Sequence, residues 1–562
     1  MTHISKVPTS ITDRNDLLAQ LSENCNANSE QQWDVIVIGG GIVGAGILQE
    51  ATRRGLKSLL IEQKDFAWGT SSRSSKMVHG GLRYIAQGDV KLTKHSLQER
   101  ERLFKEAPGL INRMGYYFII RQKQFPGRFV MSTLLNIYDW LAGIKDHRFL
   151  SVRDTINKFP TLRTEKLKGA CYYTDTVVDD SRLVMRVIHE SVQAGAQVIN
   201  YTKAKTLLKD PKTEQVIGVV ITDTSSDVTT AQASEITIKS SVVINATGAW
   251  ADMLRSEVID EKRVRPLRGS HIVVDQERLF VDACLTILHP EDQRPVFIYP
   301  WEGVTVIGTT DLDHHESLDN EATISTIEID YLLQAVNQSF PDNPLTVKDI
   351  VSTWSGVRPV IASDKDFSKH ASKERRDHAV WANNALITAS GGKLTTFRLT
   401  AIEAIDAALP WLTLKQPNQN YSDNVFTNQS FEQIFNHKRH ISPDDKLWLE
   451  RLIGRYGNNA ALLLEQGTKE EQRTIAKTKF CLAECRWAIR HEAVIHLDDL
   501  LLRRTRLGLL LKNGAAELFA PLSIIFLQEL GWETKKWRDE VTRYNAIWQQ
   551  YYSLPKTVKN TE

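Results

Sequence analysis

The chain has 562 residues, long enough for several domains with large cores. Its 70 Lys and Arg residues against 68 Asp and Glu give a formal net charge of +2, and without a block of like charge we expect no nucleic acid partner. No uncharged run reaches the roughly 18 apolar residues of a spanning helix, so membrane association would be peripheral. The five cysteines, few and odd in number, fit a reducing compartment better than a disulfide framework.

Residues 1–32 are polar and lack the apolar core and small-residue cleavage pattern of a secretory signal. We expect a cytoplasmic, partly disordered N-terminal extension.

Residues 33–62 carry the most informative pattern, WDVIVIGGGIVGAGILQEATRRGLKSLLIE. An apolar run precedes Gly39, Gly41 and Gly44 in G-x-G-x-x-G spacing, and a helical segment and a second apolar run lead to Glu62. Such glycines permit a tight turn, the close approach of a pyrophosphate and helix packing on the sheet. The helix N-terminus would hold the pyrophosphate, while Glu62 would accept hydrogen bonds from the ribose. The pattern therefore predicts a nucleotide site.

The next segment, DFAWGTSSRSSKMVHGGLRYI at residues 65–85, is dense in glycines and small hydroxyl side chains. Such small and polar side chains bury little apolar surface, so we do not expect this segment to form a hydrophobic core. It is typical of a loop whose backbone and hydroxyls wrap a polar ligand.

Residues 121–148 combine aliphatic and aromatic positions with basic flanks. The apolar positions are Phe129, Leu134, Leu135, Ile137, Tyr138, Leu141 and Ile144, and the basic ones are Arg121, Lys123, Arg128, Lys145 and Arg148. Either a helix lying in an anionic membrane interface or an ordinary amphipathic helix packed on the domain would give this pattern. The sequence favours neither.

Short apolar runs recur between helical segments from residue 34 to 390, which indicates an α/β (α+β) fold. We expect a Rossmann-type nucleotide-binding domain interleaved with a mixed-sheet substrate domain over residues 33–410. A polar connector follows at 411–442, and the helical spacing of 443–552 predicts a C-terminal all-helical domain before a short tail at 553–562.

The helical domain contains a cluster of arginines and a pair of cysteines. Arg503, Arg504 and Arg506 could dock the domain on the catalytic unit or pair with Asp498 and Asp499, unless they form a solvated face. Cys481 and Cys485 share a helix face; without further ligands at metal spacing, two buried thiols explain them better than a metal, and we expect no metal site.

Five further short motifs follow the nucleotide motif along the chain. They are NATGAW (245–250), RGSHIVV (268–274), GTTD (308–311), SGVRP (355–359) and GGKLTTFR (391–398). Together with residues 33–85 they closely resemble the FAD-dependent glycerol-3-phosphate dehydrogenases, quinone-linked members of the D-amino-acid-oxidase-like flavoenzyme superfamily. The resemblance runs over about 33–400, and EAVIHLDDLLLRRTRLGLLL extends it into the helical domain.

The resemblance implies FAD as the cofactor. A second helix N-terminus after GGK would then point at the flavin, where negative charge grows on reduction. The implied cofactor-binding residues are Gly39, Gly41, Gly44, Glu62, Thr70, Ser71, Ser72, Ser75, Lys76, Thr247, Gly248, Gly391, Gly392, Lys393, Leu394 and Thr395.

The resemblance also implies oxidation of sn-glycerol 3-phosphate to dihydroxyacetone phosphate, with electrons passed to a membrane quinone. A buried phosphate needs cationic partners, and the implied substrate-binding residues are Arg83, Tyr84, His271, Arg358, Arg376 and Lys393. Either His79 or His271 would act as the base, and the sequence does not choose between them. Arg358 or Lys393 would stabilise the developing alkoxide.

Two other functions remain open. The first is a glycerol-3-phosphate oxidase that passes electrons to oxygen, and the second is a non-catalytic, flavin-binding redox sensor. The expected location is the cytoplasm, with peripheral association at the inner face of the cell membrane, for which residues 121–148 are the candidate anchor. The oligomeric state is not set by the sequence, and a homodimer stays among the partner hypotheses.

Overall fold

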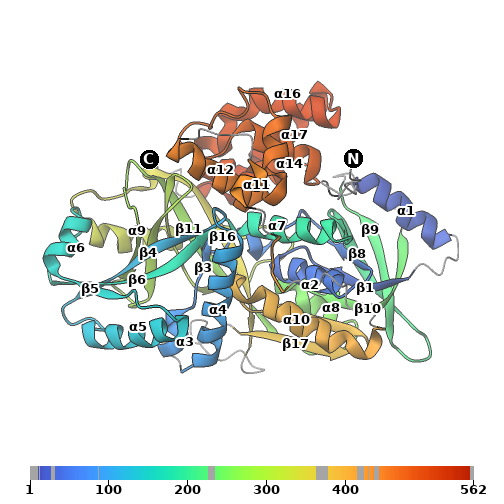
Figure 1. The fold of residues 1–562 in the computed structure, drawn as a ribbon, viewed down its shortest axis with the longest axis horizontal. Helices are drawn as coiled ribbons and strands as arrows, with labels where there is room; N and C mark the ends of the chain where they lie inside the picture. Colours follow the sequence, from blue (N-terminus) through green and yellow to red (C-terminus); the bar gives the residue numbers. More distant parts are fainter. Residues whose placement is uncertain are drawn as a thin grey trace.

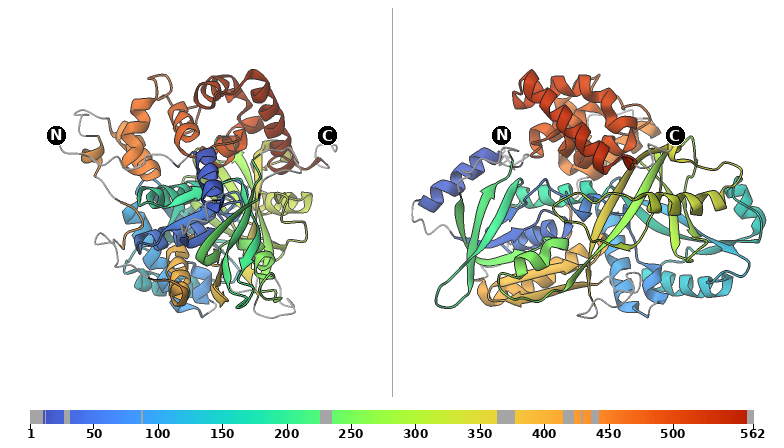
Figure 2. Two further views of the ribbon diagram at one scale, coloured as in Figure 1. Left: turned by 90° about the vertical axis from the view of Figure 1, so that its right-hand side faces the viewer. Right: turned by 180° about the vertical axis from the view of Figure 1, so that it is seen from behind.

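The computed structural model describes residues 11, 13–26, 32–86, 88–225, 235–362, 377–413, 423–427, 430–435 and 442–556, without the side chains of 24–26, 83 and 86. Two large β-sheets lie side by side, with helices against their faces and the C-terminal helices stacked above them (Figures 1 and 2).

The first sheet has a parallel centre, in the order β18-β10-β1-β2-β7. Strand β17 pairs antiparallel with β18, while β9 and β8 continue antiparallel from β10. The strands are β1 (Trp33–Ile38), β2 (Ser58–Ile61), β7 (Gln197–Ile199), β8 (Thr202–Lys209), β9 (Val216–Asp223), β10 (Ile236–Asn245), β17 (His378–Asn383) and β18 (Leu386–Gly391).

Strand β1 is apolar from Val35 to Ile38, where both of its faces are covered. Val35 and Val37 pack with helices α2 (Ile42–Arg53), α7 (Asp180–Gln193) and α10 (Phe397–Ala408). The intervening Ile36 and Ile38 pack with the β8–β9 layer and with helix α1 (Arg14–Asn26). A continuous apolar run is typical of such a buried parallel strand.

The second sheet has the order β15-β11-β14-β13-β12-β4-β6-β3, with β16 paired to β11 and β5 to β6. Along β4, Tyr116 and Phe118 pack into one core while Tyr117 and Ile119 pack into another, as expected for alternating side chains. The strands are β3 (Met77–Val78), β4 (Ile111–Arg121), β5 (Arg148–Leu150), β6 (Leu167–Val178), β11 (Val264–Asp275), β12 (Cys284–Leu288), β13 (Pro295–Trp301), β14 (Val304–Gly308), β15 (Leu312–Asp313) and β16 (Ile350–Ile361).

The chain crosses between the sheets repeatedly. It leaves the first sheet after β2, builds β3 to β6, returns for β7 to β10, builds β11 to β16, and returns for β17 and β18. The predicted interleaving of a Rossmann-type unit with a mixed-sheet unit is therefore confirmed. The remaining helices of this part are α3 (Leu82–Ala86), α4 (Val90–Glu106), α5 (Arg128–Ala142), α6 (Val152–Lys158), α8 (Ala251–Arg255) and α9 (Thr326–Ser339).

The C-terminal part is helical, as predicted, and forms the orange and red layer in Figure 1. Most of the expected connector at 411–442 lies outside the described residues. The helices are α11 (Phe431–Ile434), α12 (Pro443–Tyr456), α13 (Ala460–Gln466), α14 (Leu482–His491), the π-helix η8 (Asp499–Arg504), α15 (Leu507–Leu510), α16 (Phe519–Leu530) and α17 (Thr534–Tyr551).

Buried ion pairs join this helical part to the loop after β2 and to helix α7. The Arg504 guanidinium makes two hydrogen bonds of 2.7 Å to Asp65, and Arg182 makes two of 2.8 Å to Glu492. Arg503 contacts Asp65 and also Asp498 and Asp499. Docking and local pairing, which the sequence offered as alternatives, therefore occur together, because one guanidinium can serve several carboxylates.

Within the predicted N-terminal extension, α1 packs on the first sheet through Leu17 and Leu21, and Arg14 pairs with Asp223 at 2.5 Å. Cys481 and Cys485 are buried free thiols. No helix among the described residues is long and apolar enough to cross a membrane.

Candidate functional site: a nucleotide cavity beside a cationic cluster

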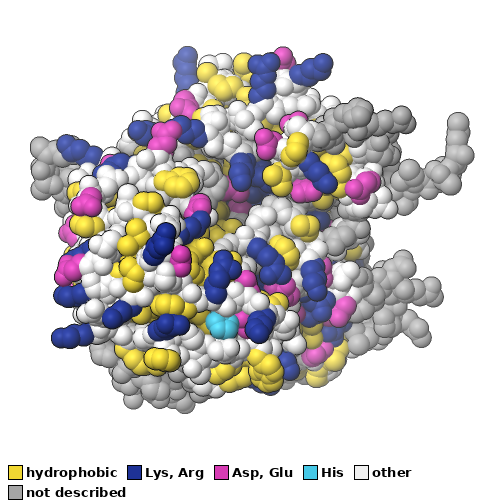
Figure 3. Space-filling view, turned by 60° about the vertical axis from the view of Figure 1, so that its left-hand side comes forward, with side chains coloured by type: hydrophobic (Ala, Val, Ile, Leu, Met, Phe, Trp, Pro, Cys, Tyr) yellow, Lys and Arg dark blue, Asp and Glu magenta, His cyan; other side chains and the backbone are white. Residues whose placement is uncertain are grey.

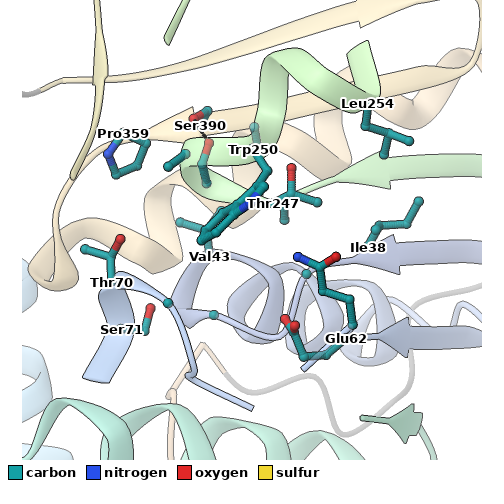
Figure 4. Close-up of a pocket in the computed structure, with 18 of the residues that line it drawn as sticks. Ile38, Val43, Glu62, Thr70, Ser71, Thr247, Trp250, Leu254, Pro359 and Ser390 are labelled. Carbon is teal, nitrogen blue, oxygen red and sulfur yellow. Dashed lines mark hydrogen bonds between the residues drawn. The ribbon is translucent and has the colours of Figure 1, made fainter. Parts of the chain in front are cut away.

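A cavity of about 390 Å³ lies at the carboxyl ends of β1, β2 and β10. Figure 4 shows Glu62 and Ser71 on one side of this cavity, with Thr247, Trp250 and Ser390 across from them. Open parallel sheets bind ligands at this edge. The predicted cofactor residues that line the cavity are Gly39, Gly41, Glu62, Thr70, Ser71, Thr247, Gly248, Gly391, Gly392, Lys393 and Leu394.

The turn from β1 to α2 has the geometry expected of the glycine motif. Gly39 has a φ of +114°, and a Cβ there would lie 2.5 Å from the Ala246 carbonyl oxygen. A Cβ on Gly44 would lie 1.8 Å from the Gly39 oxygen, so this glycine lets the helix pack against the turn. Gly44 supports the cavity without lining it.

The N-terminus of α2 faces the cavity. Gly41 is its N-cap residue, and Ser71 Oγ accepts a 2.9 Å hydrogen bond from the Ile42 N–H. A helix N-terminus favours an anion through its N–H groups and its dipole. This end of the cavity therefore suits a pyrophosphate.

Glu62 is fixed at the end of β2 by two backbone hydrogen bonds. Its carboxylate accepts from Gly40 N–H at 2.7 Å and from Lys64 N–H at 2.8 Å. Burial raises the pKa of Glu62 above its usual value, while the Lys64 and Gly40 N–H groups act to lower it. The carboxylate is thus oriented as an acceptor for hydroxyl donors in the cavity.

The opposite wall comes from segments far apart in sequence. Thr247 directly precedes the 3-10 turn η2 (Gly248–Trp250), which ends at Trp250, and Gly391 ends β18. After Lys393, a 3-10 turn η5 (Leu394–Thr396) leads into α10, so the predicted second helix is present. The sequence analysis missed the lining residues Trp68, Gln63, Lys203, Lys205, Leu254 and Glu257.

Lys393 links the cavity to a second polar region. Its ammonium lies 3.5 Å from the centroid of the Tyr84 ring and 3.2 Å from Ser96 Oγ. Both contacts come from the α3–α4 region, so two predicted substrate residues meet here.

Arg358 lies on β16 directly before Pro359, a cavity-lining residue. Its guanidinium donates to Thr309 Oγ1 at 3.0 Å and contacts Asp311 at 3.3 Å. The side chain crosses Gly269, where a Cβ would lie 2.2 Å from the guanidinium. Glycine in RGSHIVV therefore leaves room for this cation.

His271 lies near Arg358 and is almost fully buried. Its Nε2 is 2.9 Å from Ser75 Oγ, and its ring stacks on Trp354 with centroids 4.9 Å apart. Burial, and then Arg358 and Lys76, lower the pKa of His271 well below its usual value. The imidazole is therefore neutral at pH 7.

His79 is positioned through its backbone. Its N–H donates to Thr395 Oγ1 at 3.1 Å, and Thr395 Oγ1 donates to the His79 carbonyl at 3.2 Å. These contacts place the VHGG turn against the start of α10. Thr395 supports that junction and does not line the cavity.

The other predicted residues fall elsewhere. The Lys76 ammonium is fully buried and lies 3.0 Å from both Asp180 carboxylate oxygens. Ser72 follows the cavity-lining Ser71 in the chain, and Ser75 follows the cavity-lining Ser74. The side chain of Arg83 and the whole of Arg376 lie outside the described residues.

Comparisons with known proteins agree on one family. Residues 34–399 match the FAD dependent oxidoreductase family, and residues 425–537 match the C-terminal domain of alpha-glycerophosphate oxidase. The chain is 32% identical over 504 residues to the aerobic glycerol-3-phosphate dehydrogenase of Staphylococcus haemolyticus, covering 84% of this chain and 87% of the relative. The Staphylococcus aureus (strain USA300) enzyme of the same name is 32% identical over 498 residues, covering 84% and 86%.

Solved structures show the same likeness. The glycerol-3-phosphate dehydrogenase of Bacillus halodurans, complexed with FAD, superposes with a TM-score of 0.75 at 27% identity, covering 97% of this chain and 98% of that one. The L-alpha-glycerophosphate oxidase of Mycoplasma pneumoniae, with FAD bound, shares the fold at a TM-score of 0.55 and 17% identity, covering 71% and 100%.

The cavity fits FAD by its own geometry. An anion would meet the α2 N-terminus beside Gly41, where no Cβ intrudes, and ribose hydroxyls would meet the fixed carboxylate of Glu62. The cavity continues to Lys393 at the start of η5. The positive charge of Lys393 would there favour reduction of the flavin ring, which gains negative charge. The chain thus belongs to the FAD-dependent oxidoreductases, in the branch of the aerobic glycerol-3-phosphate dehydrogenases, and uses FAD as its cofactor.

Proposed function

We propose that the protein oxidises sn-glycerol 3-phosphate to dihydroxyacetone phosphate and passes the electrons to a membrane quinone. The observation that carries this proposal is the presence of a cation, Arg358, near a neutral imidazole, His271, beside the cofactor cavity in a chain of this family. Lys393 adds a second cation at the same end of the cavity. A phosphorylated alcohol requires both kinds of group.

The chain's own residues would bind the substrate and move its proton. Arg358 would hold an oxygen of the phosphate or of the developing alkoxide, because a guanidinium donates charge-assisted hydrogen bonds. A histidine would take the proton of the C2 hydroxyl as C2 becomes a carbonyl. Bound FAD supplies the acceptor for the hydride that leaves C2.

His271 is favoured over His79 as the base by its surroundings. Its imidazole is unprotonated at pH 7, and Arg358 lies close enough to affect its pKa. Since the pKa of His271 is lowered, the acid limb of kcat/KM should fall well below pH 6.5. Loss of the acid limb in His79→Asn, but not in His271→Asn, would assign the base to His79 instead.

The acceptor is tested by steady-state assays of the purified FAD-loaded protein with glycerol 3-phosphate. We expect rapid reduction of a soluble ubiquinone or menaquinone analogue and little hydrogen peroxide. Peroxide formed at a rate matching substrate loss would identify an oxidase. If glycerol 3-phosphate is not turned over with a quinone, with oxygen or with an artificial dye, the result would favour a non-catalytic flavin sensor.

Peripheral membrane association is proposed through the region of α5. One face of α5 is buried through Met131 and Leu135, while Phe125, Phe129 and Trp140 are 76%, 87% and 77% exposed. Figure 3, which brings this side of the molecule forward, shows hydrophobic and basic side chains interspersed over it. A helix with one packed face can still present aromatic residues to a lipid interface at the inner face of the cell membrane.

Sedimentation with anionic liposomes tests this association. A variant with Phe125, Phe129 and Trp140 changed to Glu should stay in the supernatant. The matched control changes Ile327, Leu447 and Ile524 to Glu; these side chains are 78%, 65% and 58% exposed elsewhere. If the first variant folds and still sediments as the wild type does, the proposed surface is wrong.

A further inference from the structure

The helical C-terminal part reaches the segment that wraps the cofactor. Ser72 ends the 3-10 turn η1 (Thr70–Ser72), whose other residues, Thr70 and Ser71, line the cavity. The Ser72 carbonyl oxygen accepts a hydrogen bond from the Arg506 guanidinium and another, of 2.9 Å, from the Lys76 ammonium. Arg506 follows the π-helix η8 and belongs to the C-terminal part.

The backbone at Arg506 is unusual for its residue type. Its φ of +62° lies in the left-handed region, and it directly precedes α15. Its side chain is almost fully buried, where the guanidinium also contacts Asp180 at 3.2 Å and the Leu502 carbonyl at 2.5 Å. Sparsely populated backbone conformations and π-helices persist where surrounding contacts fix them, often near functional sites.

Asp180 is the shared partner that connects Arg506 with the rest of the segment. Its carboxylate accepts from the Ser74 N–H at 2.9 Å, the Ser74 hydroxyl at 2.7 Å and the Lys76 ammonium at 3.0 Å. Burial lowers the pKa of Lys76 to about 7, with Arg506 acting in the same direction and Asp180 against it. Two cations, together with the N–H and the hydroxyl of Ser74, thus converge on one buried carboxylate.

A second residue of the C-terminal part holds the same segment. The Tyr552 hydroxyl accepts from the Arg73 guanidinium at 2.9 Å, and Arg73 also pairs with Glu321 at 2.6 Å. Further along, Trp354 Nε1 donates to the Ser74 carbonyl at 3.2 Å. Consecutive backbone and side-chain groups of the segment are therefore fixed from outside it.

We propose that Arg506 is a positioning residue for FAD. By holding the Ser72 carbonyl and Asp180, it fixes η1 so that Thr70 and Ser71 keep their places in the cavity wall. The C-terminal helices would then contribute to FAD binding by supporting one wall of the cavity. This inference depends on FAD binding and not on the identity of the substrate or acceptor, so it can fail while the proposed activity holds.

The test compares FAD affinity with the stability of the FAD-free protein. Arg506→Met should weaken FAD binding at least tenfold, the cost of one charge-assisted hydrogen bond, measured by flavin fluorescence on adding FAD to stripped protein. Because FAD stabilises the fold through its affinity, the gain in Tm on adding FAD should shrink too. Arg506→Lys, which keeps a donor, should recover part of the affinity.

Arg543→Met is the matched control. Arg543 pairs with Asp498 inside the helical part at 2.5 Å, so its loss removes a guanidinium without touching η1. This variant should lower Tm equally with and without FAD and leave FAD affinity within twofold of wild type. If Arg506→Met behaves in the same way, Arg506 is merely structural and the proposal fails.

Tyr552→Phe keeps the proposal testable if Arg506→Met does not fold. This variant removes only the hydroxyl that contacts Arg73. It should fold and bind FAD several-fold more weakly, with faster release of FAD on dilution. An unchanged dissociation rate in a folded Tyr552→Phe protein would contradict the role proposed for the C-terminal part.

Discussion

Gly41→Ala isolates the contribution of the α2 N-terminus to FAD binding. Gly41 is the N-cap of α2 with φ −82° and ψ −174°, a conformation open to alanine. The added Cβ would lie 3.1 Å from Ser71 Oγ, a side chain that can shift. The folded protein should therefore tolerate the methyl group, which would project where the pyrophosphate must approach.

The expected loss of affinity follows from two displaced interactions. A helix N-terminus stabilises a partly buried anion by up to ~2 kcal/mol, and a hydrogen bond to a charged group contributes about 1.5–3 kcal/mol. Losing one such bond and about half of the dipole term amounts to about 2.5–4 kcal/mol, or a 60- to 900-fold weaker Kd. The cost of alanine at an N-cap, about 1 kcal/mol at most, falls on the fold alone.

Gly127→Ala controls for that cost. Gly127 is the N-cap of α5, with φ −82° and ψ 179°, and its Cβ would meet only the Gln124 carbonyl, at 3.9 Å. Flavin fluorescence titration of both stripped variants measures Kd, and thermal unfolding without FAD measures stability. Equal FAD affinities in the two variants would refute the placement of the pyrophosphate at α2.

Three further predictions concern the site and its support. Arg358→Met should raise KM for glycerol 3-phosphate at least tenfold while the bound flavin spectrum stays unchanged; an unaltered KM would exclude Arg358 from the substrate site. Glu62→Gln should weaken FAD about fivefold, since a neutral acceptor replaces a charged one, and fluorescence titration would show no change if the ribose lies elsewhere. Despite burial, Arg504 and Arg503 hold the pKa of Asp65 below its usual range, and Arg182 does the same for Glu492. Their stabilisation is fully present above about pH 4 and declines progressively as the pH falls toward the lower folded pKa values. The Tm of the FAD-loaded protein should therefore fall steadily on acidification below about pH 4, and a Tm that does not change over that range would contradict this.

The sequence predicted those parts of the site that depend on local geometry. The run from Trp33 to Glu62 holds a strand, a glycine turn and a helix within one short segment. Its hydrophobic period and its glycines are therefore enough to predict the structure of this segment. The order of strands in the second sheet could not be predicted, because it depends on contacts between distant segments. For the same reason Lys203 and Lys205, on β8, carry no local signal for the cavity wall that they join.

Lys76 shows that a motif does not determine the contacts of a single side chain. It lies inside the TSSRSSK string, so the resemblance places it among the cofactor residues. Its ammonium pairs with the buried carboxylate of Asp180, and Lys76 is not among the residues that line the cavity. Helix α1 was not predicted because its packing rests on Leu17 and Leu21, too few apolar positions to stand out in a polar segment.

An anaerobic titration of the FAD-loaded protein with glycerol 3-phosphate tests the central claim most directly. The oxidised-flavin absorbance near ~450 nm reports hydride transfer without any electron acceptor. Stoichiometric glycerol 3-phosphate should bleach this band, while lactate and D-alanine should not. A protein that holds FAD but keeps its absorbance on adding glycerol 3-phosphate would contradict the proposed activity.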